Sequence, residues 1–183
     1  MSRDTIEVVF AVVVIACALL VGWVAGGRLG NLGNLDLRYG VLVVLAVLVQ
    51  LGGGLAGGTA YPLGLLVSVL LVAAFLGLNR AVPGVAMVAL GLLTNALVVA
   101  ANGAMPVSVW ASGKAGVSTQ DLVSGADARH EIADAGTRLR PLGDVVPVLT
   151  PGRPEVVSPG DVLVAAGLAQ LVVTGMRRRT QPA

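Results

Sequence analysis

The stretch that decides the fold begins Asn102-Gly103-Ala104-Met105-Pro106-Val107 and ends Ser158-Pro159-Gly160-Asp161. It is the one long polar segment between otherwise hydrophobic runs. Chains that alternate hydrophobic runs with a polar segment of this length place the runs in the membrane and the segment outside it. We therefore predict that residues 102–159 form a loop beside the membrane, and that the chain on either side of this loop spans it.

The composition supports this reading. Of the 183 residues, 56% are hydrophobic and 12% are charged, and the mean hydropathy is +0.88. Soluble domains carry about 25% charged residues. The sequence therefore predicts an all-α integral membrane protein with residues 1–183 in a single membrane domain. The formal net charge of +2 offers no basic domain for nucleic acid, and we expect no nucleic-acid partner.

Five apolar runs are long enough to form membrane helices, since crossing the hydrocarbon takes about 20 residues. They are residues 6–26, 40–58, 62–78, 82–101 and 160–176, of which the last is the shortest. A cleavable signal peptide is the competing reading of the first run, but the run exceeds the usual limit of about 15 residues for such a segment. In the second run, the pairs Gly53/Gly57 and Gly54/Gly58 have the spacing of a close helix contact.

The positions of the arginines predict how the chain is oriented in the membrane. The triplet Arg177, Arg178 and Arg179 follows the last run, and the shorter connectors contain Arg28, Arg38 and Arg80. Because positive residues in short loops stay in the cytoplasm, we predict a cytoplasmic C-terminus and an external N-terminus. The long loop also carries basic residues, but loops near 60 residues cross largely regardless of charge, so we place it on the extracytoplasmic side.

Two segments of the loop have local signals. Ser118 and Asp121 resemble a capping box, which predicts a short amphipathic helix over about residues 119–135. Residues 139–149 are apolar but contain two prolines, so we expect an extended or lid-like segment packed over the helix ends. Ser158 and Asp161 repeat the capping pattern at the start of the last run.

Three motifs in order resemble a known family. They are Asn102-Gly103-x-Met105-Pro106-Val107, Thr137-x-Leu139-x-x-Leu142-Gly143-Asp144-x-x-Pro147 and Ser158-x-Gly160-Asp161. This pattern is similar to the domain-of-unknown-function family 5317, which contains small bacterial multi-spanning proteins. The resemblance implies a bacterial cytoplasmic (inner) membrane location and transfers no activity and no catalytic residue. Ala104 stands where the pattern leads us to expect a second glycine, which bears on the backbone geometry of this turn.

Asn95 and Asn102 are candidate ligand-binding residues on the fourth run. They are seven residues apart and therefore share one helix face. Such side chains usually form hydrogen bonds between membrane helices. The alternative is a polar path, which Gln50 and Gln170 on other runs could complete.

The loop contributes three further candidates, Arg138, Asp144 and Asp161. Asp161 is best explained as the cap of the last helix, whereas Asp144 fits a turn and a functional carboxylate equally well. If the two acids converge, they could bind a divalent cation or act as acid and base. Arg138 and Arg140, on an extended segment, would point the same way and could pair with Asp144 or hold an anionic headgroup.

Other polar residues of the loop have weaker signals. His130 and Glu131 read as the solvated face of the amphipathic helix, because their spacing matches no zinc motif. Ser108 and Ser112 lack the sequence context of a nucleophile. We predict no metal site and no cofactor.

These observations favour a non-enzymatic scaffold or accessory subunit whose external loop caps the bundle and binds a partner protein or lipid. The expected partners are membrane lipids and a second protein or further copies of the chain. One alternative is a small transporter or channel subunit with a polar path along the fourth helix. Another is an enzyme acting on lipid headgroups at the external interface.

Overall fold

The computed structural model describes residues 3–56, 60–119, 130–149 and 154–178. Five long helices dominate it: α1 (Arg3–Val24), α2 (Val41–Ala56), α3 (Ala60–Leu78), α4 (Val85–Asn102) and α7 (Pro159–Arg177). Each coincides with one of the five apolar runs to within about three residues at either end. The helical segments that hydrophobicity predicts are therefore confirmed.

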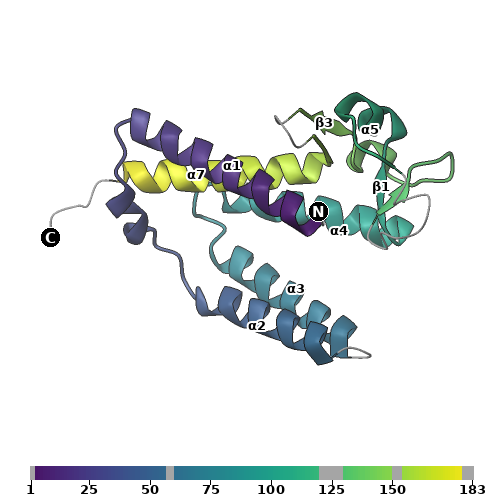
Figure 1. Ribbon diagram of the computed structural model, residues 1–183. Helices are drawn as coiled ribbons and strands as arrows, with labels where there is room; N and C mark the ends of the chain where they lie inside the picture. Colours follow the sequence, from purple (N-terminus) through teal and green to yellow (C-terminus); the bar gives the residue numbers. More distant parts are fainter. Residues whose placement is uncertain (1–2, 57–59, 120–129, 150–153, 179–183) are drawn as a thin grey trace, which may run out of the picture.

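Helix α7 is the centre of a three-helix bundle and packs against both α1 and α4 (Figure 1). Glycines two turns apart line the α4–α7 contact. They are Gly84 at the N-cap of α4, Gly91 within α4, and Gly160 and Gly167 on α7. A Cβ atom on Gly167 would lie 2.6 Å from the Gly84 carbonyl oxygen, and one on Gly160 would lie 2.7 Å from the Gly91 carbonyl oxygen. The two helices are thus antiparallel and in backbone contact, as small residues permit between membrane helices.

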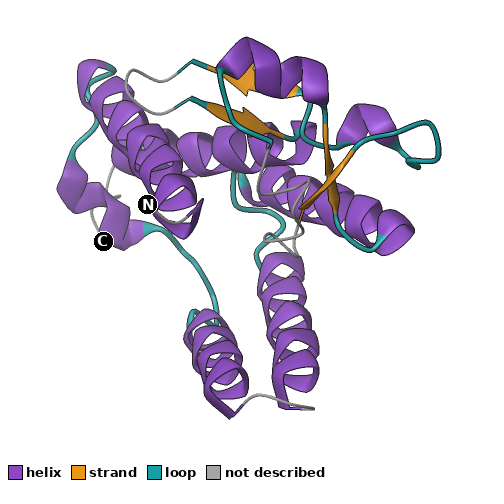
Figure 2. Cartoon of the chain, turned by 45° about the vertical axis from the view of Figure 1, so that its right-hand side comes forward, coloured by secondary structure: helices purple, strands orange, loops and turns teal. Residues whose placement is uncertain are grey.

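Helices α2 and α3 form an antiparallel hairpin that projects from this bundle in both ribbon views (Figures 1 and 2). At their contact, a Cβ atom on Gly53 would lie 3.2 Å from the Gly64 Cα atom. The prediction of a close glycine contact at Gly53 is confirmed, and the facing residue belongs to α3. Gly57 and Gly58 lie outside the described residues.

The connector between α1 and α2 is bound to the end of α3 by the side chain of Asn79. The segment between α1 and α2 contains a short 3₁₀ helix, η1 (Leu29–Asn34). Near its end, the Arg38 N–H donates to Asn79 Oδ1 at 2.7 Å, and Asn79 Nδ2 donates to the Arg38 carbonyl at 2.9 Å. Asn79 is only 2% exposed. The start of α2 is thereby fixed to the end of α3.

The described residues between 103 and 157 form a compact unit that we call the loop domain. Its described elements are β1 (Met105–Val107), α5 (Val109–Ala115), β2 (His130–Ile132), η2 (Arg140–Leu142), β3 (Val146–Val148) and β4 (Glu155–Val157). β1 and β2 pair in parallel, and β3 and β4 pair antiparallel. The all-α expectation is therefore wrong for this domain. Its short, proline-containing apolar segments satisfy their backbone groups by pairing with distant parts of the chain.

The prediction of an amphipathic helix over residues 119–135 is wrong for the described residues of this segment. Residues 130–132 are strand β2 and residues 133–136 are not helical, while residues 120–129 lie outside the described chain. A helix does form earlier, at α5, between the N-cap Ser108 and the left-handed C-cap Gly116. The prolines of residues 139–149 do exclude a regular helix, since this segment contains only η2 and β3.

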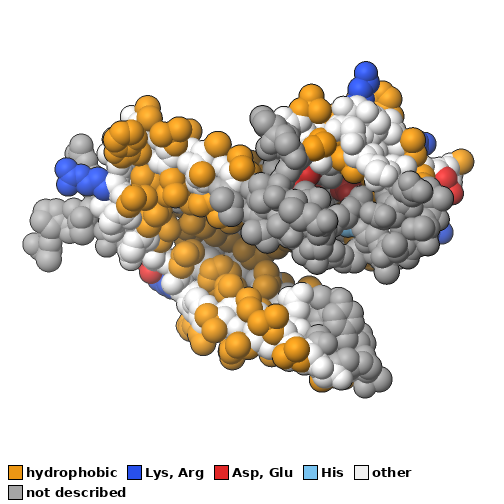
Figure 3. Space-filling model, in the orientation of Figure 1, with side chains coloured by type: hydrophobic (Ala, Val, Ile, Leu, Met, Phe, Trp, Pro, Cys, Tyr) orange, Lys and Arg blue, Asp and Glu red, His pale blue; other side chains and the backbone are white. Residues whose placement is uncertain are grey.

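Apolar side chains cover the visible face of the helices, and charged side chains gather toward the ends (Figure 3). In the described chain, α4 and α7 are long and apolar enough to cross a membrane, yet only 17% and 22% of these stretches are buried. Shorter apolar stretches occupy Val13–Val24, Val41–Gly53 and Leu66–Leu78. Exposed apolar helices of this kind favour a lipid environment over water.

Candidate functional site

The start of α7 carries a complete capping box. Ser158, in an extended conformation, accepts a hydrogen bond from the Asp161 N–H at 3.0 Å, and Asp161 Oδ2 accepts one from the Ser158 N–H at 2.9 Å. Pro159 occupies the first helical position, where its lack of an N–H costs nothing. The predicted role of Asp161 as the cap of this helix is confirmed.

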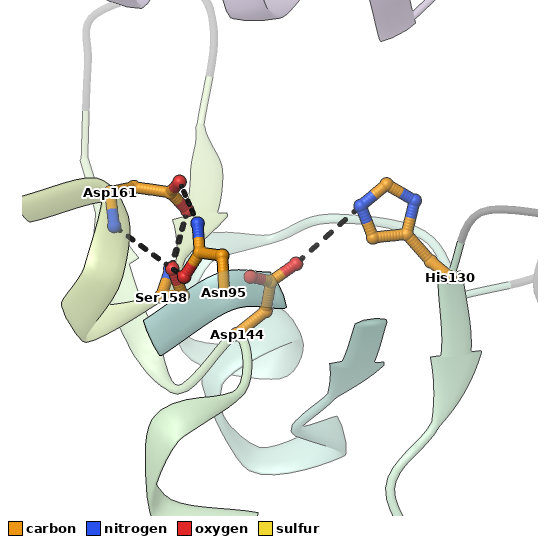
Figure 4. A network of polar contacts seen from close by, with 5 residues as sticks. All are labelled: Asn95, His130, Asp144, Ser158 and Asp161. Carbon is orange, nitrogen blue, oxygen red and sulfur yellow. Dashed lines mark hydrogen bonds and ion pairs between the residues drawn. The ribbon is translucent and has the colours of Figure 1, made fainter. Parts of the chain in front are cut away.

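Asn95 joins α4 to this cap (Figure 4). Its Nδ2 donates to Asp161 Oδ1 at 2.7 Å, and the Ser158 hydroxyl donates to Asn95 Oδ1 at 2.8 Å. The same hydroxyl lies 2.7 Å from Asp161 Oδ2, so its single proton is shared between two acceptors. Ser158 is completely buried, and a side chain at Gly160 would overlap the Asn95 amide. Asn95 thus makes the interhelical hydrogen bonds that the sequence favoured.

At the end of α4, Asn102 binds the loop domain by hydrogen bonds. Its Nδ2 donates to the Arg138 carbonyl at 2.9 Å, and its Oδ1 accepts the Arg138 N–H at 2.8 Å. This amide pairs with the backbone of the loop domain much as a neighbouring strand would. Arg138 therefore contributes its backbone to the junction, and its side chain is exposed. Between Arg138 and Arg140, Leu139 has a left-handed φ of 51°, so the extended geometry expected for the two arginines is wrong.

Gly103 ends α4 with a φ of 91°, and its N–H donates to the Val99 carbonyl. This left-handed position is the one in the turn that needs a glycine. Ala104 has no positive φ, so alanine is compatible with the turn at the place where the family resemblance led us to expect a second glycine.

Asp144 is 6% exposed and lies on the opposite side of β1 from β2. Its N–H donates to the Pro106 carbonyl at 2.8 Å, and its own carbonyl accepts the Ser108 N–H at 2.9 Å. Its Oδ2 lies 3.7 Å from His130 Nε2 (Figure 4). His130 is thus a half-buried partner of Asp144, and the prediction that it lies on a solvated helix face is wrong. No local spacing signals this pair, because the two residues are fourteen positions apart and meet through the parallel pairing of β2 with β1.

A family model matches most of the chain. The model of a family of unknown function, DUF5317, covers residues 34–173. The chain belongs to this family. No curated protein and no solved structure is significantly similar to it. The DUF5317 match contains the loop domain and the residues of both networks, from Asn95 to Asp161, and excludes α1 and the end of α7.

In this DUF5317 chain the two acids of the candidate site belong to different networks. Asp161 is bound by Asn95 and Ser158, whereas Asp144 is held by β1 and faces His130. Within the part of the chain that the structure describes, no group of three or more His, Cys, Asp and Glu side chains lies close enough to hold a metal ion. The arrangement is suited to fixing the loop domain on the helix ends.

The structure also shows where the residues of the predicted polar path lie. Asn95 and Asn102 are engaged in hydrogen bonds, while Gln50 on α2 and Gln170 on α7 are exposed. The DUF5317 chain therefore holds Asn95 and Asn102 in contacts near the loop domain, and Gln50 and Gln170 on exposed helix faces.

Proposed function

We propose that the protein is a non-enzymatic membrane scaffold or accessory subunit with five spans, α1, α2, α3, α4 and α7. Its loop domain caps the bundle and binds a partner protein or lipid. The exposed apolar faces of the helices support membrane insertion, because burying such surface in lipid contributes roughly 25 cal/mol per Å².

One observation carries the scaffold role. Asn95, Ser158 and Asp161 bind one another, and Asn102 binds the backbone of Arg138. Asn95 fixes α4 to the cap of α7, where the chain leaves the loop domain, and Asn102 fixes the loop domain itself to the end of α4. A domain held this firmly at the helix ends is suited to presenting a surface to a partner.

The proposed interaction surface is the exposed apolar part of the loop domain. Trp110 is 65% exposed in the first turn of α5, beside Val109 at 54%, and Leu149 is 74% exposed. Exposed aromatic residues of this kind are enriched where proteins bind one another or meet a membrane surface.

A photo-crosslinking amino acid at position 110 tests this surface in native membranes. We expect one discrete crosslinked product, whose mass identifies a protein or a lipid partner. The same amino acid at Gly136, an exposed position of the loop domain, is the matched control and should give no such product. If position 110 gives nothing, or if both positions give the same products, the scaffold proposal fails.

The proposed orientation places the loop domain outside the bacterial cytoplasmic membrane, with an external N-terminus and a cytoplasmic C-terminus. It is supported by Arg28, Arg38, Arg80 and Arg177, which all lie on connectors or helix ends away from the loop domain. Lys114→Cys introduces an exposed thiol in the loop domain, and Cys17→Ala removes the native one. An impermeant maleimide should label this variant in intact cells. Labelling that requires broken cells would reverse the orientation.

A second candidate is an enzyme acting on lipid headgroups, and the pair of His130 and Asp144 favours it. A nearly buried carboxylate beside a histidine has the composition of a general base. The lipids of cells that produce the wild type, Asp144→Asn or no protein distinguish the two candidates. A product made only with the wild type would establish the enzyme, and identical lipid profiles would remove it.

A further inference from the structure

The ends of α1 and α7 meet η1 in a tightly packed junction. Met176, near the end of α7, is fully buried, and its carbonyl accepts the Arg28 N–H at 2.9 Å and Asn31 Nδ2 at 2.8 Å. A Cβ atom on Gly27 would lie 2.7 Å from the Met176 Cβ atom, so the segment after α1 is pressed directly onto α7. This contact joins positions about 150 residues apart in the chain.

The junction gathers positive charge. It places Arg28 beside Arg177 and Arg178, and we call these three residues the arginine corner. Arg28 and Arg177 are exposed, and Arg178 is half-buried. None of them forms an ion pair with another described residue, and the connector that follows contains a single acid, Asp36. The backbone contact brings the three arginines to the same end of the bundle, where their like charges repel one another and attract an anion.

Exposed apolar side chains border the arginine corner. Trp23 is 69% exposed, Val24 is 76% exposed and Leu29 is 62% exposed, all within five residues of Arg28 along the chain. A tryptophan and aliphatic side chains beside arginines match the boundary between acyl chains and headgroups in a membrane. A free anion would use the arginines alone, whereas a lipid uses both the charges and the apolar border.

We infer that the arginine corner binds the phosphate of an anionic phospholipid, with the acyl chains along the end of α1. The inference rests on the proposed membrane location and adds a site at the end of the bundle away from the loop domain. The corner lies outside residues 34–173, so it is not part of the region that the family model matches.

Native mass spectrometry of the full chain in detergent tests the site. Phosphatidylglycerol and phosphatidylcholine with identical acyl chains are added in equal amounts, and the retained lipids are counted. Each arginine near an anionic membrane surface contributes a preference of about fivefold. We expect the wild type to retain phosphatidylglycerol at least about tenfold better.

The variant Arg28→Gln, which keeps the arginines after α7 and their effect on orientation, should lose about fivefold of this preference. Combining it with Arg177→Gln and Arg178→Gln should abolish the preference. The matched control removes three charges from the loop domain (Lys114→Gln, Arg138→Gln and Arg140→Gln) and should retain it. No preference in the wild type, or an equal loss in the control, would overturn the site. Release of the protein from membranes by alkaline carbonate would instead overturn the proposed membrane location.

Discussion

Replacing Asn95 by leucine isolates the polar contact between α4 and the cap of α7. Leucine has nearly the shape of asparagine but cannot form hydrogen bonds. The change therefore leaves the packing against Gly160 largely intact and removes two interactions, the bond to Asp161 at 2.7 Å and the bond from Ser158 at 2.8 Å.

The expected loss of stability follows from the groups to which Asn95 is hydrogen-bonded. A hydrogen bond to a charged group contributes about 1.5–3 kcal/mol, and one between membrane helices contributes about 0.6–2 kcal/mol. Asp161 keeps its bonds to Ser158 after the change, which reduces the penalty on the carboxylate. We therefore expect Asn95→Leu to lower the free energy of unfolding by about 2 kcal/mol.

Reversible unfolding with sodium dodecyl sulfate in mixed micelles, followed by tryptophan fluorescence, measures this loss. Thr94→Val is the matched control, because Thr94 donates only to Leu90 of its own helix. It should change the stability by less than about 0.5 kcal/mol. A loss from Asn95→Leu no larger than that of the control would refute the reasoning.

A double-mutant cycle tests whether the network acts as a unit. Combined with Ser158→Ala, the loss from Asn95→Leu should be smaller than in the wild-type background by about 1 kcal/mol, since both changes remove the same bond. Strictly additive losses would mean that the two side chains contribute independently.

Two further predictions concern packing and the connectors. Gly167→Ala should lower stability by about 1–3 kcal/mol, because its Cβ atom would lie 2.6 Å from a carbonyl oxygen of α4, whereas Gly77→Ala meets nothing within 4 Å and should lose nothing in the same unfolding assay. Asn79→Ala removes two bonds to the backbone of Arg38 and should speed tryptic cleavage after that residue at least about tenfold, while cleavage after Arg138 in the same digest stays constant; equal rates in variant and wild type would contradict this.

The positions of the long helices could be predicted because they depend on local sequence. A helix satisfies the backbone polar groups of an apolar run within the run itself, and each of the five runs forms one, namely α1, α2, α3, α4 and α7. The capping box of Ser158 and Asp161 is equally local, since its partners are three residues apart.

The glycine-spacing and helix-capping patterns in the sequence were informative, but they indicated only some of the contacts and helices that the structure contains. The glycine spacing in the second run correctly marked Gly53 as a close contact, but the spacing of seven in Gly84/Gly91 and Gly160/Gly167 carries the central α4–α7 contact. Likewise, Ser108 and Gly116 bracket α5, whereas the capping pattern at Ser118 suggested a helix that would have run through β2.

The sequence by itself therefore determined the helical segments, the start of α7 and the family. Only the tertiary structure decided what the polar residues do. Asn95 meets Asp161 across 66 positions of chain, and His130 meets Asp144 only because β2 pairs with β1. Strand pairing satisfies backbone groups of segments that are distant in sequence, and side chains are brought together by the helices and strands that carry them. Such contacts leave no periodicity in the sequence, so they become visible only when the chain has folded.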